Sequence, residues 1–172
     1  MSAHRFHPTI LRAYDIRGIF EDTLTTEDAF AIGLSFISIQ EQRGLGNEVT
    51  VGRDGRVSSP ALAAALIDGL VAGGAQVSNI GCGPTPMLYF AAQELGSGGA
   101  IQVTGSHNPP THNGFKMVMG GLSFFGADIE ELGRVSAAGP DRADNGGGVS
   151  RAIEEAYVNR LAAGAVATGL SV

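Results

Sequence analysis

The stretch AIQVTGSHNPPTHNGFK at residues 100–116 decides the fold class and the candidate site of this chain. Its apolar start, Ala100–Val103, predicts a buried strand. Gly105 lets the backbone turn without a Cβ clash, and the two prolines at 109–110 stiffen the turn because each fixes its own φ. The stretch therefore predicts that the Ser106 hydroxyl sits on a rigid loop at the carboxyl end of a strand, where open α/β sheets bind ligands.

Strand and helix patterns alternate on both sides of this stretch. Short apolar runs predict further strands at 48–52, 76–80 and 115–119, and residues 14–20 read as a short strand or an extended loop. Apolar residues at helical spacing predict helices at about 25–44, 59–73, 87–95, 127–135 and 152–161. This alternation predicts an α/β fold in three layers, a mostly parallel or mixed four-stranded sheet covered by helices on both faces. The hairpin-like return from Val103 to Phe115 would place one strand antiparallel.

A polar, glycine-rich stretch at residues 139–150 is typical of a surface loop or linker. We expect residues 1–145 to form one domain. Residues 146–172 are then expected to be a linker loop and helix that lead to a second domain absent from this chain.

Composition excludes several classes of function. A net charge of -6 provides no basic stripe for nucleic acid, and a single cysteine provides neither a disulfide nor a cysteine metal site. No apolar stretch reaches 18 residues, so we expect no membrane span and a cytoplasmic protein. Lys116 is the only lysine beside ten arginines, and a compact ammonium suits a phosphate or a proton transfer.

Four motifs together resemble those of the α-D-phosphohexomutases, the phosphoglucomutase and phosphomannomutase family. They are Tyr14–Gly18, Val51–Arg56, Gly83–Pro86 and Thr104–Lys116, and they occur in the family's order. The resemblance implies the N-terminal domain of an enzyme that interconverts hexose 1-phosphate and hexose 6-phosphate. It also implies a phosphorylated hexose substrate, a glucose or mannose 1,6-bisphosphate intermediate, and Mg²⁺ as cofactor.

The resemblance also implies roles for individual residues. Ser106 would be the phosphoserine and would hold the metal through its phosphoryl group, with the remaining metal ligands on the absent second domain. Arg17 and Lys116 would flank the transferring phosphoryl group, and His107 would assist proton transfer. A phosphoryl transition state needs mainly positioning and cations around its oxygens, which a guanidinium fork and an ammonium supply.

Two further residues complete the implied site. Asn108 would hold the loop or contact the phosphate, and Tyr14 would line the substrate cleft. The family places an Asp-Gly-Asp metal loop on its second domain, and this chain contains no Asp-x-Asp. We therefore expect negligible mutase activity from the chain alone, which would need the missing domains of the longer enzyme.

Two other functions stay open at this point. One is a serine hydrolase, although neighbours on an extended segment point to opposite faces, which disfavours a bond between Ser106 and His107. The other is a non-catalytic module that binds a phosphosugar or a partner protein. Arg53, Asp54 and Arg56 are expected to form a surface salt-bridge cluster that holds a turn.

Overall fold

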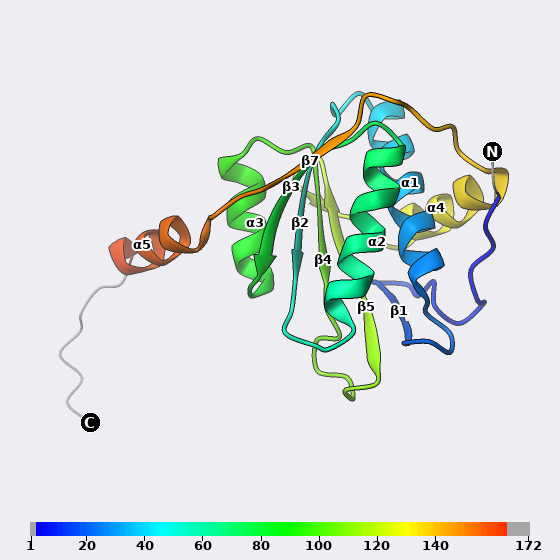
Figure 1. The fold of residues 1–172 in the computed structure, drawn as a ribbon, viewed down its shortest axis with the longest axis horizontal. Helices are drawn as coiled ribbons and strands as arrows, with labels where there is room; N and C mark the ends of the chain where they lie inside the picture. The colour runs from blue at the N-terminus through cyan, green and yellow to red at the C-terminus, as the bar shows by residue number, and fades with distance from the viewer. Residues whose placement is uncertain (1–2, 165–172) are drawn as a thin grey trace.

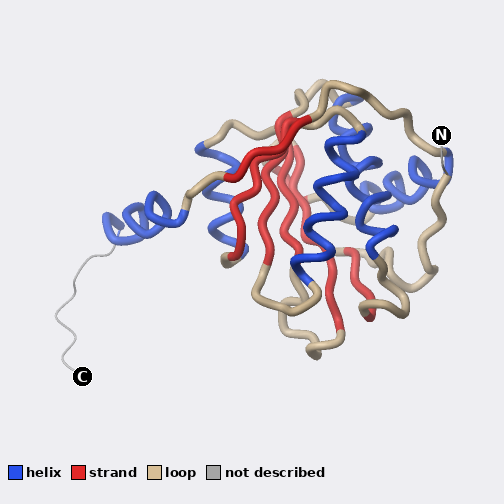
Figure 2. Tube along the Cα trace, viewed as in Figure 1, coloured by secondary structure: helices blue, strands red, loops and turns tan. Residues whose placement is uncertain are grey.

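The computed structural model describes residues 3–164, which form a mixed sheet between helices (Figures 1 and 2). The strands of the described chain are β1 Ile16–Ile19, β2 Glu48–Arg53, β3 Gln76–Cys82, β4 Gly99–Val103, β5 His112–Met119, β6 Leu122–Ser123 and β7 Gly147–Ser150. Its helices are α1 Thr26–Gln42, α2 Ser59–Ala72, α3 Thr85–Glu94, α4 Ala127–Ala138 and α5 Glu154–Gly164.

The strand order is β1-β5-β4-β2-β3-β7, with β6 paired to β5. Strands β4, β2, β3 and β7 run parallel, whereas β5 is antiparallel to both β4 and β1. The α/β class and the mixed sheet are therefore confirmed. The expected number of four strands is too small, because β1, β6 and β7 extend the sheet to seven strands within the described residues. Two of these additions are hard to predict: β6 has two residues and β7 lacks an apolar pattern.

Helices cover both faces of the sheet (Figure 1). Helices α1, α2 and α4 lie on one face, over a core that includes Phe36, Val51 and Phe115. Helix α3 lies on the other face, over a smaller core that includes Leu88 and Ala100. Because side chains alternate along each strand, neighbours such as Ala100 and Ile101 contribute to opposite cores.

Local sequence signals fix several helix ends. Thr25 and Asp28 form a capping box at the start of α1, as the threonine predicts. Helix α3 begins at Thr85, two residues before the predicted start, because Pro84 in extended conformation serves as its N-cap and Pro86 fits the first turn.

The predicted loop at 139–150 includes a strand. β7 pairs in parallel with β3, so residues 147–150 belong to the sheet. Helix α5 follows with none of its residues buried, and Tyr157 lies 5.6 Å from Phe90 of α3 between ring centroids. The expected division at residue 145 stays a prediction, and part of the expected linker, 165–172, lies outside the described residues. Within residues 3–164, no helix is both long and apolar enough to cross a membrane.

Candidate functional site

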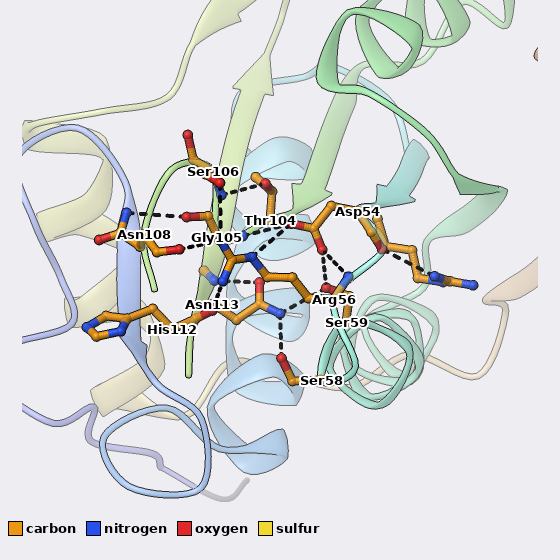
Figure 3. Close-up of polar contacts among 12 residues, drawn as sticks. Asp54, Arg56, Ser58, Ser59, Thr104, Gly105, Ser106, Asn108, His112 and Asn113 are labelled. Atoms are coloured by element: carbon orange, nitrogen blue, oxygen red, sulfur yellow. Dashed lines mark hydrogen bonds and ion pairs between the residues drawn. The ribbon is translucent and has the colours of Figure 1, made fainter. Parts of the chain in front are cut away.

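The loop from β4 to β5 lies at the carboxyl end of the parallel strands (Figure 1), and Ser106 belongs to this loop. Ser106 is exposed and has a φ of 53°, in the left-handed region that a non-glycine residue seldom adopts. Its backbone amide donates to the Thr104 hydroxyl at 2.9 Å. Its side chain points away from the body of the loop (Figure 3). The hydroxyl is thus free to meet a ligand at the sheet edge.

His107 lies beside the Ser106 hydroxyl. The distance from Ser106 Oγ to His107 Nδ1 is 3.3 Å. The expectation that these neighbours point to opposite faces is therefore wrong, because Ser106 is left-handed and the alternation rule applies only to extended backbone. In the part of the chain that the structure describes, no carboxylate bonds the His107 ring, so no Ser-His-acid triad is formed.

Arg17 contacts the loop at Gly105, the residue before Ser106. It projects from β1, is 4% exposed, and donates to the Gly105 carbonyl oxygen at 2.8 Å. Its other guanidinium nitrogen bonds the Asp15 carboxylate. The guanidinium is therefore held against the residue that precedes Ser106.

Lys116 projects from β5 on the same face of the sheet as Arg17. Arg17 is paired with Gly114, and residues two apart on a strand share a face. Lys116 takes part in none of the ion pairs found among residues 3–164. Two cations therefore occupy one face of neighbouring strands, and the ammonium is available to an anionic ligand.

Tyr14 and Asn108 occupy different parts of this edge. Tyr14 is 81% exposed and stacks on Phe125 with ring centroids 6.3 Å apart. Asn108 is half-buried, and its side-chain amide donates to the Gly105 carbonyl oxygen at 3.3 Å. The Asn108 contact holds the loop, while the roles of both residues toward a substrate stay predictions.

Arg56 is the residue that sequence reasoning underestimated. Its guanidinium donates to the loop carbonyl oxygens of Ser106, Asn108, Pro109 and His112 at 3.1, 2.6, 2.6 and 3.0 Å (Figure 3). The expected ion pair within the turn exists, with 3.4 Å between Arg56 Nε and Asp54 Oδ2. The cluster nevertheless holds the Ser106 loop more than its own turn. The available signal is a charged motif that ends β2, the parallel neighbour of β4.

Asp54 anchors the other side of the same loop. One carboxylate oxygen accepts from the Gly105 amide at 3.0 Å, and the other accepts from the Ser59 hydroxyl. Partial burial alone would raise the pKa of Asp54, but hydrogen bonds from Ser59, Arg56, Gly105 and Thr104 lower it below its ordinary value. Asp54 is thus a carboxylate at neutral pH, fixed between α2 and the loop.

The described residues do not form a complete metal site. No group of three or more His, Cys, Asp or Glu side chains in residues 3–164 could hold a metal ion. Magnesium prefers oxygen ligands that include one or two carboxylates. Side chains of this part of the chain therefore do not fit a magnesium ion by themselves.

Comparisons with known proteins show which family this chain is similar to. A family model described as phosphoglucomutase/phosphomannomutase, alpha/beta/alpha domain I, matches residues 8–139. The chain is 50% identical over 124 residues to a phosphomannomutase/phosphoglucomutase of Pseudomonas aeruginosa, which covers 72% of this chain and 27% of that protein. It is 46% identical over 123 residues to a phosphoglucomutase of Neisseria gonorrhoeae, with 72% and 26% covered.

A solved structure gives the same result. A phosphoglucomutase/phosphomannomutase family protein from Burkholderia thailandensis superimposes with a TM-score of 0.82 and 40% identity, covering 92% of this chain and 36% of that one. The matched region spans about a quarter of the length of the curated relatives.

Proposed function

This chain belongs to the phosphoglucomutase/phosphomannomutase family, and we propose that it supplies the phosphoserine of an enzyme that interconverts hexose 1-phosphate and hexose 6-phosphate. The observation that carries this proposal is the exposed Ser106 hydroxyl on a loop that Arg56, Asp54 and Arg17 hold by hydrogen bonds. A phosphate carrier needs both properties, because the group must reach solvent and must stay in one place.

The proposed reaction has two transfers. In the first, a sugar hydroxyl attacks the phosphoryl group on Ser106 and releases its proton to solvent, the bond from phosphorus to Ser106 Oγ breaks, and a bisphosphate forms. In the second, after the bisphosphate has turned around, Ser106 Oγ attacks its other phosphoryl group, the bond from that phosphorus to the sugar oxygen breaks, and the sugar oxygen takes a proton from solvent. The sugar leaves with its phosphate on the other carbon, and the enzyme is phosphorylated again.

His107 is suited to manage the proton on Ser106. Its Nδ1 lies 3.3 Å from Oγ, close to hydrogen-bond distance. His107 gives a proton to Oγ as the phosphorus–oxygen bond breaks, and takes it back when Oγ attacks the bisphosphate. Protein groups that transfer a proton in this way contribute about 10²–10⁴ in rate.

Arg17 and Lys116 are suited to neutralise the transferring group. Charge spreads over three phosphoryl oxygens in the transition state, and fixed cations stabilise it without reorganising. Arg17 is held by Asp15 and the Gly105 carbonyl, so its orientation is set before substrate binds.

We also propose that catalysis requires groups outside residues 3–164. The chain matches only about a quarter of the relatives' length and lacks a carboxylate cluster for magnesium in its described part. A magnesium ion would supply further charge neutralisation at the phosphoryl group on Ser106, and we expect its other ligands to come from another domain. The chain alone is then expected to have negligible mutase activity. A cytoplasmic location, where phosphorylated sugars are metabolised, is part of the same proposal.

A domain exchange tests the proposed function. The chimera is the Pseudomonas aeruginosa relative with residues 8–139 of this chain, the segment that the family model matches, in place of its own domain I; the two chains are 50% identical over 124 residues. It should convert glucose 1-phosphate to glucose 6-phosphate, and its Ser106→Ala variant should not. An inactive chimera that is folded and binds hexose phosphate would contradict the proposal and would favour a binding module.

A further inference from the structure

The guanidinium of Arg56 is enclosed by the Ser106 loop. Its two terminal nitrogens each donate to two carbonyl oxygens, at distances from 2.6 to 3.1 Å. The four carbonyls belong to residues 106 to 112, so the Arg56 side chain forms hydrogen bonds along almost the whole loop. Its Nε lies 3.4 Å from the Asp54 carboxylate, so an ion pair holds the guanidinium on its remaining side-chain nitrogen.

Close packing around Gly105 restricts the conformation of the loop. A Cβ built on Gly105 would lie 2.1 Å from Arg56 Nε, so the guanidinium fills the space beside this glycine. The Gly105 amide is bonded to Asp54 and its carbonyl to Arg17. Both peptide groups that flank Gly105 are therefore fixed before the chain reaches Ser106.

The conformation of Ser106 needs such support. A non-glycine residue in the left-handed region costs about 1–3 kcal/mol and persists only when its surroundings determine it. At Ser106 the left-handed backbone places Oγ beside His107 and away from the guanidinium. An extended backbone at the same residue would direct the two neighbouring side chains to opposite sides.

We propose that Arg56 is a positioning residue for phosphoryl transfer, which holds Ser106 left-handed and so aims its Oγ at the incoming phosphoryl group. Arg56 touches no reacting atom in this arrangement, and the inference rests on the proposed function of Ser106. Lysine cannot replace it, because an ammonium has three donors on a compact point, whereas the planar fork serves four carbonyls in fixed directions.

The first test measures, in this chain and not in the chimera, how well ordered the Ser106 loop is. The amides of Ser106, Asn108 and His112 are bonded within the loop, at 2.9, 3.0 and 3.0 Å, so their hydrogen exchange reports its order. Arg56→Lys should speed their exchange about tenfold or more, while the Val51 amide in the core stays unchanged as the folding control. Adding guanidinium ion to Arg56→Ala should slow the exchange again.

The matched control is Arg53→Lys. Arg53 carries the same charge in the same motif, but within residues 3–164 its side chain bonds only the Asp54 carbonyl oxygen, at 3.2 Å. Its substitution should leave loop exchange within about twofold of the unchanged chain. Equal exchange in the Arg56→Lys and Arg53→Lys variants would overturn the proposal.

The second test measures turnover in the chimera. Arg56→Lys should lower kcat about tenfold or more and leave KM for glucose 1-phosphate within about twofold, because both terminal nitrogens of Arg56 are already bonded to loop carbonyl oxygens. A change confined to KM would also overturn the proposal. An unsubstituted chimera that is folded and binds hexose phosphate but is inactive would refute the proposed function instead, and the exchange measurements would then still decide whether Arg56 positions Ser106.

Discussion

Replacing Asp54 by asparagine should destabilise the protein in a way that depends on pH. The Asp54 carboxylate accepts from the amides of Gly105 and Arg56 at 3.0 and 3.1 Å and from the Ser59 hydroxyl. A hydrogen bond to a charged group contributes about 1.5–3 kcal/mol. The Asp54 side chain is 24% exposed, and asparagine keeps one acceptor oxygen. The substitution should therefore remove only part of the summed contribution of these hydrogen bonds. We expect Asp54→Asn to lower the free energy of unfolding by about 2 kcal/mol at pH 7, close to one charged bond.

The sign of the pH dependence follows from the lowered pKa of Asp54. Hydrogen bonds from Ser59, Arg56, Gly105 and Thr104 outweigh the opposing effect of burial and keep this pKa below its ordinary value of about 3.9. The contribution of Asp54 is therefore fully present above the unfolded pKa and is lost as pH falls through the folded pKa. The stability difference between the two proteins should be constant above about pH 5 and should shrink below about pH 4.

Urea unfolding at about pH 7, 5 and 3 measures this difference, because the lowest value lies below the ordinary pKa of an aspartate. The control is Asp68→Asn in α2, which removes an exposed carboxylate far from the loop in sequence and should change stability by less than about 0.5 kcal/mol. A difference for Asp54→Asn below about 0.5 kcal/mol at pH 7, or one that grows on acidification, would refute the reasoning.

Two other substitutions probe the fold and the site. A Cβ on Gly69 would lie 2.0 Å from the Phe30 carbonyl oxygen, so Gly69→Ala should lower the free energy of unfolding by about 1–3 kcal/mol although alanine favours helices. In Gly133→Ala the added methyl meets only the end of a leucine side chain, so urea unfolding should show a smaller loss; equal losses would contradict the packing argument. Lys116→Met should lower turnover of the chimera about 10²-fold or more while leaving its unfolding midpoint nearly unchanged, because Lys116 takes part in no ion pair among residues 3–164. Turnover within about twofold would exclude the role of its ammonium.

Features that depend on nearby residues could be predicted from the sequence. The capping box of α1 joins Thr25 to Asp28, three residues apart, and the strand before Ser106 is a short apolar run between turn residues. The antiparallel direction of β5 followed from a return too short for a crossover helix. These signals were sufficient to place Ser106 at the carboxyl end of the sheet.

Features that depend on distant residues could not be predicted in the same way. Arg56 meets carbonyl oxygens 50 to 56 residues away, and backbone acceptors leave no side-chain signature. Strand β7 pairs through its backbone and is nearly all exposed, so it has no apolar pattern. The contact between Ser106 and His107 arises from a left-handed residue, which the sequence around a serine does not indicate.

The location of the phosphoryl group is the most direct test of the account. The chimera can be incubated with glucose 1,6-bisphosphate, digested, and mapped by mass spectrometry for phosphorylated peptides. We predict a single phosphoryl group on Ser106 in this segment, which disappears in Ser106→Ala together with turnover. A phosphoryl group on another residue, or turnover that persists in Ser106→Ala, would contradict the central claim.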